Sequence, residues 1–124
     1  MIYSDLTRRY FESAATAGEL QGPDILRGAA GDKDQGAWVQ FDLKVTNGIV
    51  EASRFLAFAC PHTIAVAAWL TETAIGKPLR PSLPESTQAL RARFEVPVEK
   101  MGRLLVIEDA WSRAAARLAS SQAG

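Results

Sequence analysis

The chain has 124 residues, of which 48% are hydrophobic and 23% charged, and its 14 basic residues balance 14 acidic ones. This length and composition predict a single domain, residues 1–124, with a substantial apolar core. The zero formal net charge argues against a general nucleic-acid binder and against a protein of anionic membranes, because both need a basic excess. The lone cysteine cannot form an internal disulfide, and no apolar window is long enough to span a bilayer, so we expect a cytoplasmic protein.

The first half of the chain predicts one helix and one hairpin. Ser4 is suited to cap a first helix, in which Leu6, Tyr10 and Ala14 follow at helical spacing. Apolar and polar residues then alternate from Trp38 to Thr46, which is the pattern of a half-buried strand.

The hairpin turn is predicted at Asn47-Gly48, because both residue types tolerate a positive φ. Ile49–Ala59 then returns as the partner strand. Before the hairpin, residues 18–34 hold at most one weak edge strand, near Ile25–Ala30.

Helices dominate the second half. Pro61–Ile75 is apolar nearly all round and predicts a buried helix that Gly76 caps. Ser82-Leu83-Pro84-Glu85 has the spacing of a capping box, which predicts a helix to about Phe94. A last helix is predicted from about Val98 to Ser120, with a core stripe formed by Leu104, Ile107, Trp111, Ala114, Ala115 and Leu118. A hairpin followed by helices indicates an α+β fold with the helices on one face of a small antiparallel sheet.

The only cysteine lies at the junction of two predicted elements. Cys60 ends the apolar strand, and Pro61 is favoured at the first position of the helix that follows. The unpaired N–H groups and the dipole of a helix N-terminus favour a thiolate, which is the reactive form of cysteine. The alternative is a buried structural cysteine that behaves as a small hydrophobe.

Val39 to Leu79, VQFDLKVTNGIVEASRFLAFACPHTIAVAAWLTETAIGKPL, resembles the centre of the IscU/NifU-type iron–sulfur cluster assembly scaffold family. The shared features are a strand ending in Leu-Lys-Val, a Gly-Ile-Val-Glu turn, Ala-Ser-Arg-Phe, an apolar strand that reaches a cysteine, and a closing Gly-Lys-Pro-Leu. Tyr10-Phe11-Glu12 and Glu108-Asp109-Ala110 also match. The resemblance implies a three-stranded antiparallel sheet with helices on one face, as in IscU- and SufE-like proteins, and a role in iron–sulfur cluster assembly that is not enzymatic.

The ligand set departs from the family pattern. Family scaffolds present three cysteines and an aspartate to a metal or a nascent cluster, and only the middle cysteine, Cys60, is present here. The family's Cys-Gly-Asp motif is replaced by Gln35-Gly36-Ala37, and its His-Cys pair by Gly102-Arg103. The resemblance therefore implies no cofactor in the monomer, and an iron–sulfur cluster, iron or zinc only with additional ligands.

The resemblance implies that Cys60 accepts sulfur as a persulfide from a cysteine desulfurase, or supplies one metal ligand to a cluster shared between two chains. Arg103, His62 and Gln35 are its predicted supporting residues. Arg103 would repel a metal ion and stabilise a thiolate or persulfide, and His62 would assist deprotonation or join Cys60 at a metal. Each also has a plainer interpretation: a solvated charge at Arg103, and a surface or helix-cap histidine at His62.

The alternative function is a non-catalytic interaction module that binds or regulates a cysteine desulfurase or another assembly component. That hypothesis does not need Cys60, whereas the sulfur-acceptor hypothesis does. Partners are expected among iron–sulfur assembly proteins rather than nucleic acids or membranes, and the sequence leaves the oligomeric state open.

Overall fold

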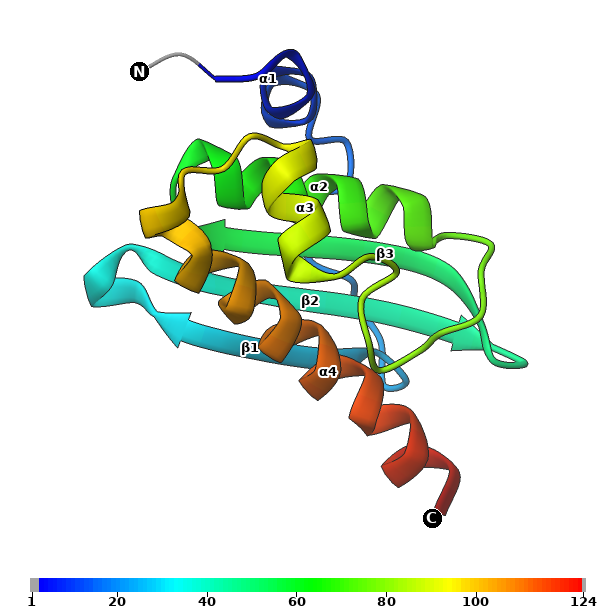
Figure 1. Cartoon of the computed structure of the whole chain (residues 1–124). Coiled ribbons are helices and arrows are strands. Elements are labelled where there is room, and N and C mark those ends of the chain that lie inside the picture. The colour runs from blue at the N-terminus through cyan, green and yellow to red at the C-terminus, as the bar shows by residue number, and fades with distance from the viewer. Residues whose placement is uncertain (1–2, 124) are drawn as a thin grey trace.

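The computed structural model describes residues 3–123 and the side chains as far as residue 118 (Figure 1). Its sheet has three antiparallel strands in the order β1-β2-β3, formed by Leu26–Asp32, Ala37–Thr46 and Ile49–Phe58. Four α-helices accompany the sheet in this part of the chain: α1 (Asp5–Glu12), α2 (Pro61–Ala74), α3 (Thr87–Arg93) and α4 (Met101–Ala123). Two short 3-10 turns, η1 (Lys33–Gln35) and η2 (Val98–Lys100), precede β2 and α4. The α+β prediction is confirmed.

The hairpin forms where the alternating pattern predicts it. Strands β2 and β3 pair from Trp38↔Phe58 to Thr46↔Ile49, and Asn47 and Gly48 turn the chain with φ of 54° and 79°. Every second residue of β2 faces the helices, so that Val39, Phe41 and Leu43 are fully buried. This alternation fixes the register, because a slip of one residue would expose all three side chains.

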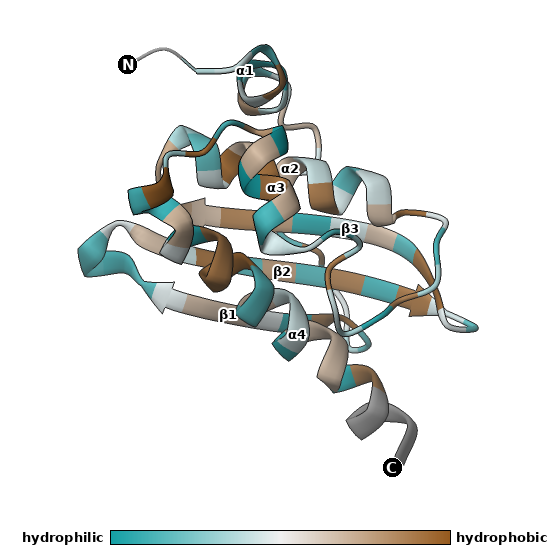
Figure 2. Ribbon diagram, in the orientation of Figure 1, coloured by the Kyte–Doolittle hydropathy of each residue, from teal (hydrophilic) through white to brown (hydrophobic). Residues whose placement is uncertain are grey.

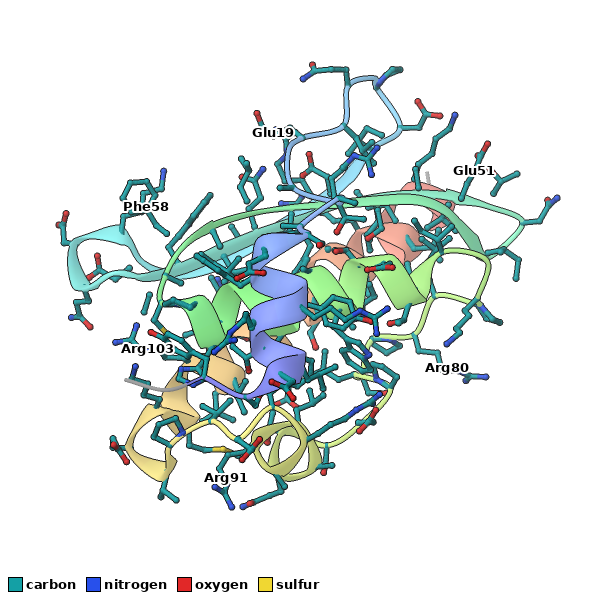
Figure 3. All side chains as sticks on the ribbon, turned by 90° about the horizontal axis from the view of Figure 1, so that it is seen from above. Glu19, Glu51, Phe58, Arg80, Arg91 and Arg103 are labelled. Atoms are coloured by element: carbon teal, nitrogen blue, oxygen red, sulfur yellow. The ribbon has the colours of Figure 1, made fainter. Side chains whose placement is uncertain are left out.

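Strand β1 is the weakly predicted edge strand, and specific contacts hold it in place. The buried carboxylate of Asp42 accepts hydrogen bonds from Arg27 Nε at 2.7 Å and Nη2 at 2.8 Å, and from the Leu20 N–H at 2.9 Å. These bonds tie β1 and the preceding loop to the centre of the sheet. Figure 3 shows Glu19 of that loop on the face opposite the helices.

The helices cover the other face of the sheet. Helix α2 packs on β3, and α4 crosses β1 and β2, while α1 packs on α2 and α3 on α4 (Figure 1). The predicted core stripe of α4 is confirmed from Leu104 to Ala115, and the Trp111 indole meets the Phe41 ring edge-on at 5.3 Å. Figure 2 shows hydrophobic colour along the strands and α2, whereas the turn between β1 and β2 is hydrophilic. Within residues 3–123, none of the helices has the length and apolar character that a bilayer span needs.

Two boundary predictions in the second half are wrong. Ser82 does not begin a helix: the N-cap of α3 is Ser86, whose hydroxyl accepts the Ala89 N–H at 3.1 Å, and Glu85 pairs with Arg93 instead. Gly76 does not cap α2, because its N–H bonds to Val50 O in the sheet at 2.8 Å.

The last helix begins slightly later than predicted. Residues 98–100 form the 3-10 turn η2, and the α-helical part starts at Met101. A 3-10 turn is a common way for an α-helix to begin. Here it brings Lys100 and Arg103 to the end of the sheet at which β3 stops.

Candidate functional site

Cys60 lies at the junction that the sequence predicts. Strand β3 ends at Phe58, and Cys60 is the extended N-cap of α2, with φ of −74° and ψ of 164°. Pro61 is the first helical residue, and the first intrahelical bond joins the Ile64 N–H to Cys60 O at 3.1 Å. The thiol is free and only partly exposed, so it combines access from solvent with the field of a helix N-terminus.

The environment of the thiol favours its ionised form. Burial raises the pKa of Cys60, but the hydroxyl of Thr63, 3.4 Å from Sγ, and the Thr63 backbone N–H lower it, as do the charges of Lys100 and Arg103. The net result is a pKa below the ordinary cysteine value. A lowered pKa and partial exposure are the properties of reactive rather than structural cysteines.

Arg103 joins this site to the turn before β2. Its Nη1 donates a 2.9 Å hydrogen bond to Gly36 O, and its charge is close enough to lower the pKa of Cys60. Three segments that are far apart in the sequence therefore meet here: the β1–β2 turn, the start of α2 and the start of α4. Arg103 is partly buried, its guanidinium is hydrogen-bonded to the turn before β2, and its charge acts on the Cys60 thiol.

Gln35 is near the site but not oriented into it. It ends η1, is exposed, and makes no hydrogen bond to Cys60 among the described residues. Gly36 follows with a left-handed φ of 67°, and Ala37 begins β2. The segment that replaces Cys-Gly-Asp thus offers the site a backbone carbonyl, at Gly36, in place of a thiol and a carboxylate.

His62 is neither a surface residue nor a partner of the thiol. Its side chain is 3% exposed and meets the ring of Tyr3 edge-on, with centroids 4.7 Å apart. Burial lowers the pKa of His62, and the charge of Lys100 lowers it further, so the neutral imidazole is favoured. Its Nδ1 has no hydrogen-bond partner within residues 3–123, and His62 forms no hydrogen bond with Cys60 there.

The described residues do not form a closed metal site. No group of three histidine, cysteine, aspartate or glutamate side chains lies close enough in residues 3–123 to hold an ion. Asp32, a nearby carboxylate, accepts the Asp34 N–H at 2.9 Å and so caps η1. One thiol, with a permanent cation beside it, does not fit the four-ligand sites that zinc and iron–sulfur clusters require.

Two residues of the site were not predicted from the sequence. Thr63 follows Cys60 by three positions, which is the spacing at which an N-cap side chain meets the first turn of a helix. Lys100 precedes Arg103 by three positions, which places both cations on one face of a helical segment. Both spacings are visible in the sequence, although only the fold shows that they converge on one thiol.

Comparison with known proteins places this arrangement in a family. The family model described as "NifU-like N terminal domain" matches residues 2–123. The IscU iron–sulfur cluster assembly scaffold protein of Haemophilus influenzae is 28% identical over 125 residues, covering 98% of this chain and 99% of that protein. The corresponding protein of Azotobacter vinelandii is 28% identical over 113 residues, covering 89% of this chain and 88% of its own.

Solved structures agree on the fold. The NifU-like N-terminal protein of Brucella abortus superposes with a TM-score of 0.72 at 19% identity, covering 94% of each chain. A scaffold protein described for the SUF system of Fervidobacterium islandicum superposes with a TM-score of 0.69 at 12% identity, covering 92% of this chain and 94% of that one. With the sequence match over nearly all residues, these results show that the chain belongs to the NifU-like N-terminal, or IscU/NifU-type, family of iron–sulfur cluster assembly scaffold proteins.

Proposed function

We propose that this protein serves iron–sulfur cluster assembly as a sulfur acceptor, with Cys60 receiving sulfane sulfur from a cysteine desulfurase. The observation that carries the proposal is the Cys60 thiol itself, held at the α2 N-terminus between the Thr63 hydroxyl and the charges of Lys100 and Arg103. Because the chain belongs to the scaffold family, other iron–sulfur assembly proteins are its expected partners. In this role the chain is a carrier, which holds sulfur on Cys60 and passes it to a second protein.

The transfer is a thiolate exchange. The Cys60 thiolate attacks the outer sulfur of the desulfurase persulfide, a new S–S bond forms at Cys60, and the donor's S–S bond breaks. The donor cysteine leaves as a thiolate, and the hydrogen of the outer sulfur stays on the new persulfide. No external oxidant or reductant is needed. Arg103 and Lys100 stabilise the attacking thiolate and then the persulfide anion.

The cluster is cargo that this chain does not hold alone. The site offers one thiolate and no group of three metal-ligating side chains within residues 3–123, and the resemblance implies Arg103 at the place of the family's third cysteine. Sulfur leaving Cys60 would go to a second protein with a fuller ligand set. A shared cluster, with Cys60 as one ligand, would require the remaining ligands from a partner chain.

Mass spectrometry of the intact protein tests the proposal. After anaerobic incubation with a cysteine desulfurase and L-cysteine, the wild type is expected to gain sulfur that a thiol reductant removes. Cys60→Ser is expected to gain none, and Arg103→Glu to gain it more slowly, because the thiolate fraction falls. Lys44→Gln, which changes an exposed cation on β2, serves as the charge control.

A second outcome would support the interaction-module hypothesis instead. If the wild type stays unmodified while it still binds the desulfurase or changes its rate, and Cys60→Ser behaves in the same way, Cys60 is not an acceptor. The protein would then act through its surface alone.

A further inference from the structure

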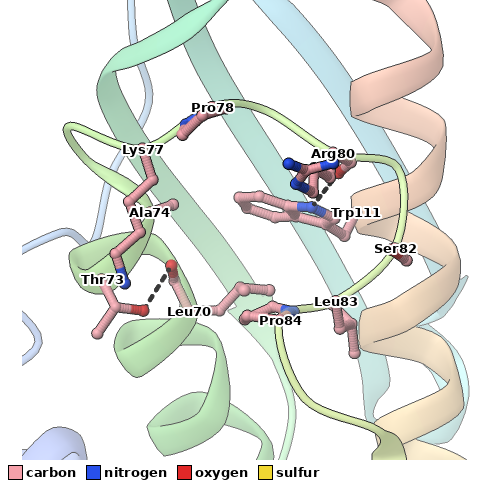
Figure 4. A pocket seen from close by; sticks show the side chains of 10 residues that line it. All are labelled: Leu70, Thr73, Ala74, Lys77, Pro78, Arg80, Ser82, Leu83, Pro84 and Trp111. Carbon is pink, nitrogen blue, oxygen red and sulfur yellow. Dashed lines mark hydrogen bonds between the residues drawn. The ribbon is translucent and has the colours of Figure 1, made fainter.

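A cavity of about 360 Å³ lies at the end of α2 remote from Cys60, between α2, the loop of residues 75–86 and α4 (Figure 4). Helix α2 lines the cavity from Leu70 to Ala74, so that roughly 10 to 14 residues of helix, or about 15–20 Å, separate it from Cys60. Its volume falls within the range of small-molecule sites, roughly 300–1,000 Å³. Neither the sulfur-acceptor proposal nor the family ligand positions involve it.

The loop that closes the cavity is held at several points. The Val50 N–H bonds to Lys77 O and the Leu79 N–H to Gly48 O, both at 2.9 Å, which ties the loop to the hairpin. On the other side, Trp111 Nε1 donates to Arg80 O at 3.0 Å. Pro78, Pro81 and Pro84 stiffen the segment between these ties. The cavity is therefore preformed, and a ligand would not have to order its walls.

The interior of the cavity is apolar. Trp111, Leu70 and Leu83 line it, with Ala74 leaving space beside them (Figure 4). The polar atoms of its walls are largely used within the protein: the indole N–H bonds to Arg80 O, and the Thr73 hydroxyl donates to Trp69 O at 2.8 Å. An apolar or aromatic group could occupy this space without leaving a buried donor unpaired.

The charged groups of the cavity are of one sign. Lys77 and Arg80 line it, and no carboxylate does. Neither cation forms an ion pair within residues 3–123, whereas Arg27, Arg93 and Arg113 each do. Glu108 and Asp109 line a separate depression. Two unpaired cations at the rim of an apolar cavity are complementary to an anion with an apolar body.

We propose that this cavity binds a small carboxylic acid with an aromatic or branched aliphatic body. The apolar body packs against Trp111 and Leu70, and the carboxylate pairs with Arg80 beside Trp111, while Lys77 adds positive charge at the opposite wall (Figure 4). Charge-assisted hydrogen bonds to Arg80 would orient the acid, since a guanidinium matches a carboxylate in geometry. The protein thereby carries a ligand site that is separate from its sulfur chemistry.

The test is titration of the full-length protein with 4-phenylbutyrate, followed by NMR and tryptophan fluorescence, beside the uncharged analogue 4-phenyl-1-butanol. We expect the acid to bind about tenfold more tightly than the alcohol and to shift the resonances of Leu70, Ala74 and Trp111. The double variant Lys77→Gln/Arg80→Gln is expected to weaken the acid about five- to tenfold and leave the alcohol unchanged. Lys44→Gln, an exposed lysine on the sheet, is expected to leave both affinities unchanged.

A variant that fills the cavity distinguishes binding inside the cavity from binding elsewhere on the surface. Ala74→Leu is expected to abolish binding of both probes while the α2 and α4 resonances elsewhere keep their positions. The proposal is overturned if acid and alcohol bind alike, if neither shifts the cavity resonances at millimolar concentration, or if Lys44→Gln weakens the acid as much as the double variant. Sulfur uptake at Cys60 is measured separately, so that failure of this proposal and failure of the sulfur-acceptor proposal are distinguishable.

Discussion

At the scale of single residues, the ionisation of Cys60 depends on a neutral neighbour as well as on charges. The Thr63 hydroxyl is fully buried against the thiol, and its effect on the Cys60 pKa exceeds that of Lys100 or Arg103. A buried hydrogen bond is not screened by salt, whereas exposed charges are. The thiolate should therefore persist at ionic strengths that weaken the two cations.

We expect Thr63→Val to raise the pKa of Cys60 more than Arg103→Gln does, because valine keeps the shape of threonine and removes only the hydroxyl. The measurement is the pH dependence of iodoacetamide alkylation, in which the rate at neutral pH falls as the pKa rises. Thr73→Val, in the same helix, serves as the control because its hydroxyl bonds to Trp69 O. Equal alkylation profiles for wild type and Thr63→Val would show that the hydroxyl does not act on the thiol.

The lowered pKa of His62 predicts that the free energy of unfolding decreases in acid. Its folded-state pKa lies below the ordinary value, so below about pH 6.5 the unfolded state binds more protons than the folded state. The stability that the neutral His62 contributes is therefore fully present above that pH. It is lost as the pH falls toward the folded-state pKa. Urea unfolding at about pH 7.5 and about pH 5.5 measures this difference.

His62→Phe should remove that component of the acid loss, because phenylalanine keeps the aromatic contact with Tyr3 and has no titrating group. At about pH 7.5 the variant should lie within about 1 kcal/mol of the wild type, since the unpaired Nδ1 is lost as well. If the variant and the wild type lose the same free energy of unfolding between these two pH values, groups other than His62 cause the acid sensitivity.

At the scale of elements, the backbones of β1 and α4 approach each other closely at Gly28. A Cβ at Gly28 would lie 2.2 Å from Ala114 N and 2.7 Å from Ala110 O, and both neighbours are helix backbone that cannot move aside locally. Small residues on both elements therefore let the longest helix lie directly on an edge strand. That contact helps to set the position of α4 on the sheet, and Arg103 belongs to the same helix.

We expect Gly28→Ala to cost about 3 kcal/mol or more of unfolding free energy, because α4 must lift from the sheet. Gly102→Ala is the matched control in α4: a Cβ there meets nothing within 4 Å, and alanine should stabilise the helix by up to about 1 kcal/mol. Chemical denaturation of both variants gives the comparison. A neutral Gly28→Ala would mean that β1 and α4 are less closely packed than described.

Elements set by local pattern were predictable, and those set by tertiary contacts were not. The hairpin at Asn47-Gly48 and the start of α2 at Pro61 follow from turn and proline chemistry. The capping box at Ser82 failed because Glu85 pairs with Arg93 and the preceding loop is tied to Trp111. The spacing of Ser82 and Glu85 suits a capping box, but Glu85 pairs with Arg93 and Ser86 caps α3 instead.

At the scale of the whole molecule, the fold brings together residues whose separation in sequence hides their relation. Cys60 was identifiable from its position between strand and helix, and Arg103 from the family alignment. The burial of His62 was not identifiable, because its neighbour Tyr3 precedes α1 and is far from His62 in the sequence. The cavity beside Trp111 was equally hidden, since α2, the loop and α4 each supply only part of its wall.

The protein combines the family fold with a single cysteine at the start of α2, and residues 3–123 form no closed metal site. Native mass spectrometry under anaerobic conditions, after incubation with a cysteine desulfurase, L-cysteine and ferrous iron, reads sulfur and iron on the same chain. The account predicts added sulfur on the wild-type monomer, none on Cys60→Ser, and no iron retained on either. A wild-type monomer that holds iron and sulfide together at near-full occupancy, or one that takes up no sulfur at all, would contradict it.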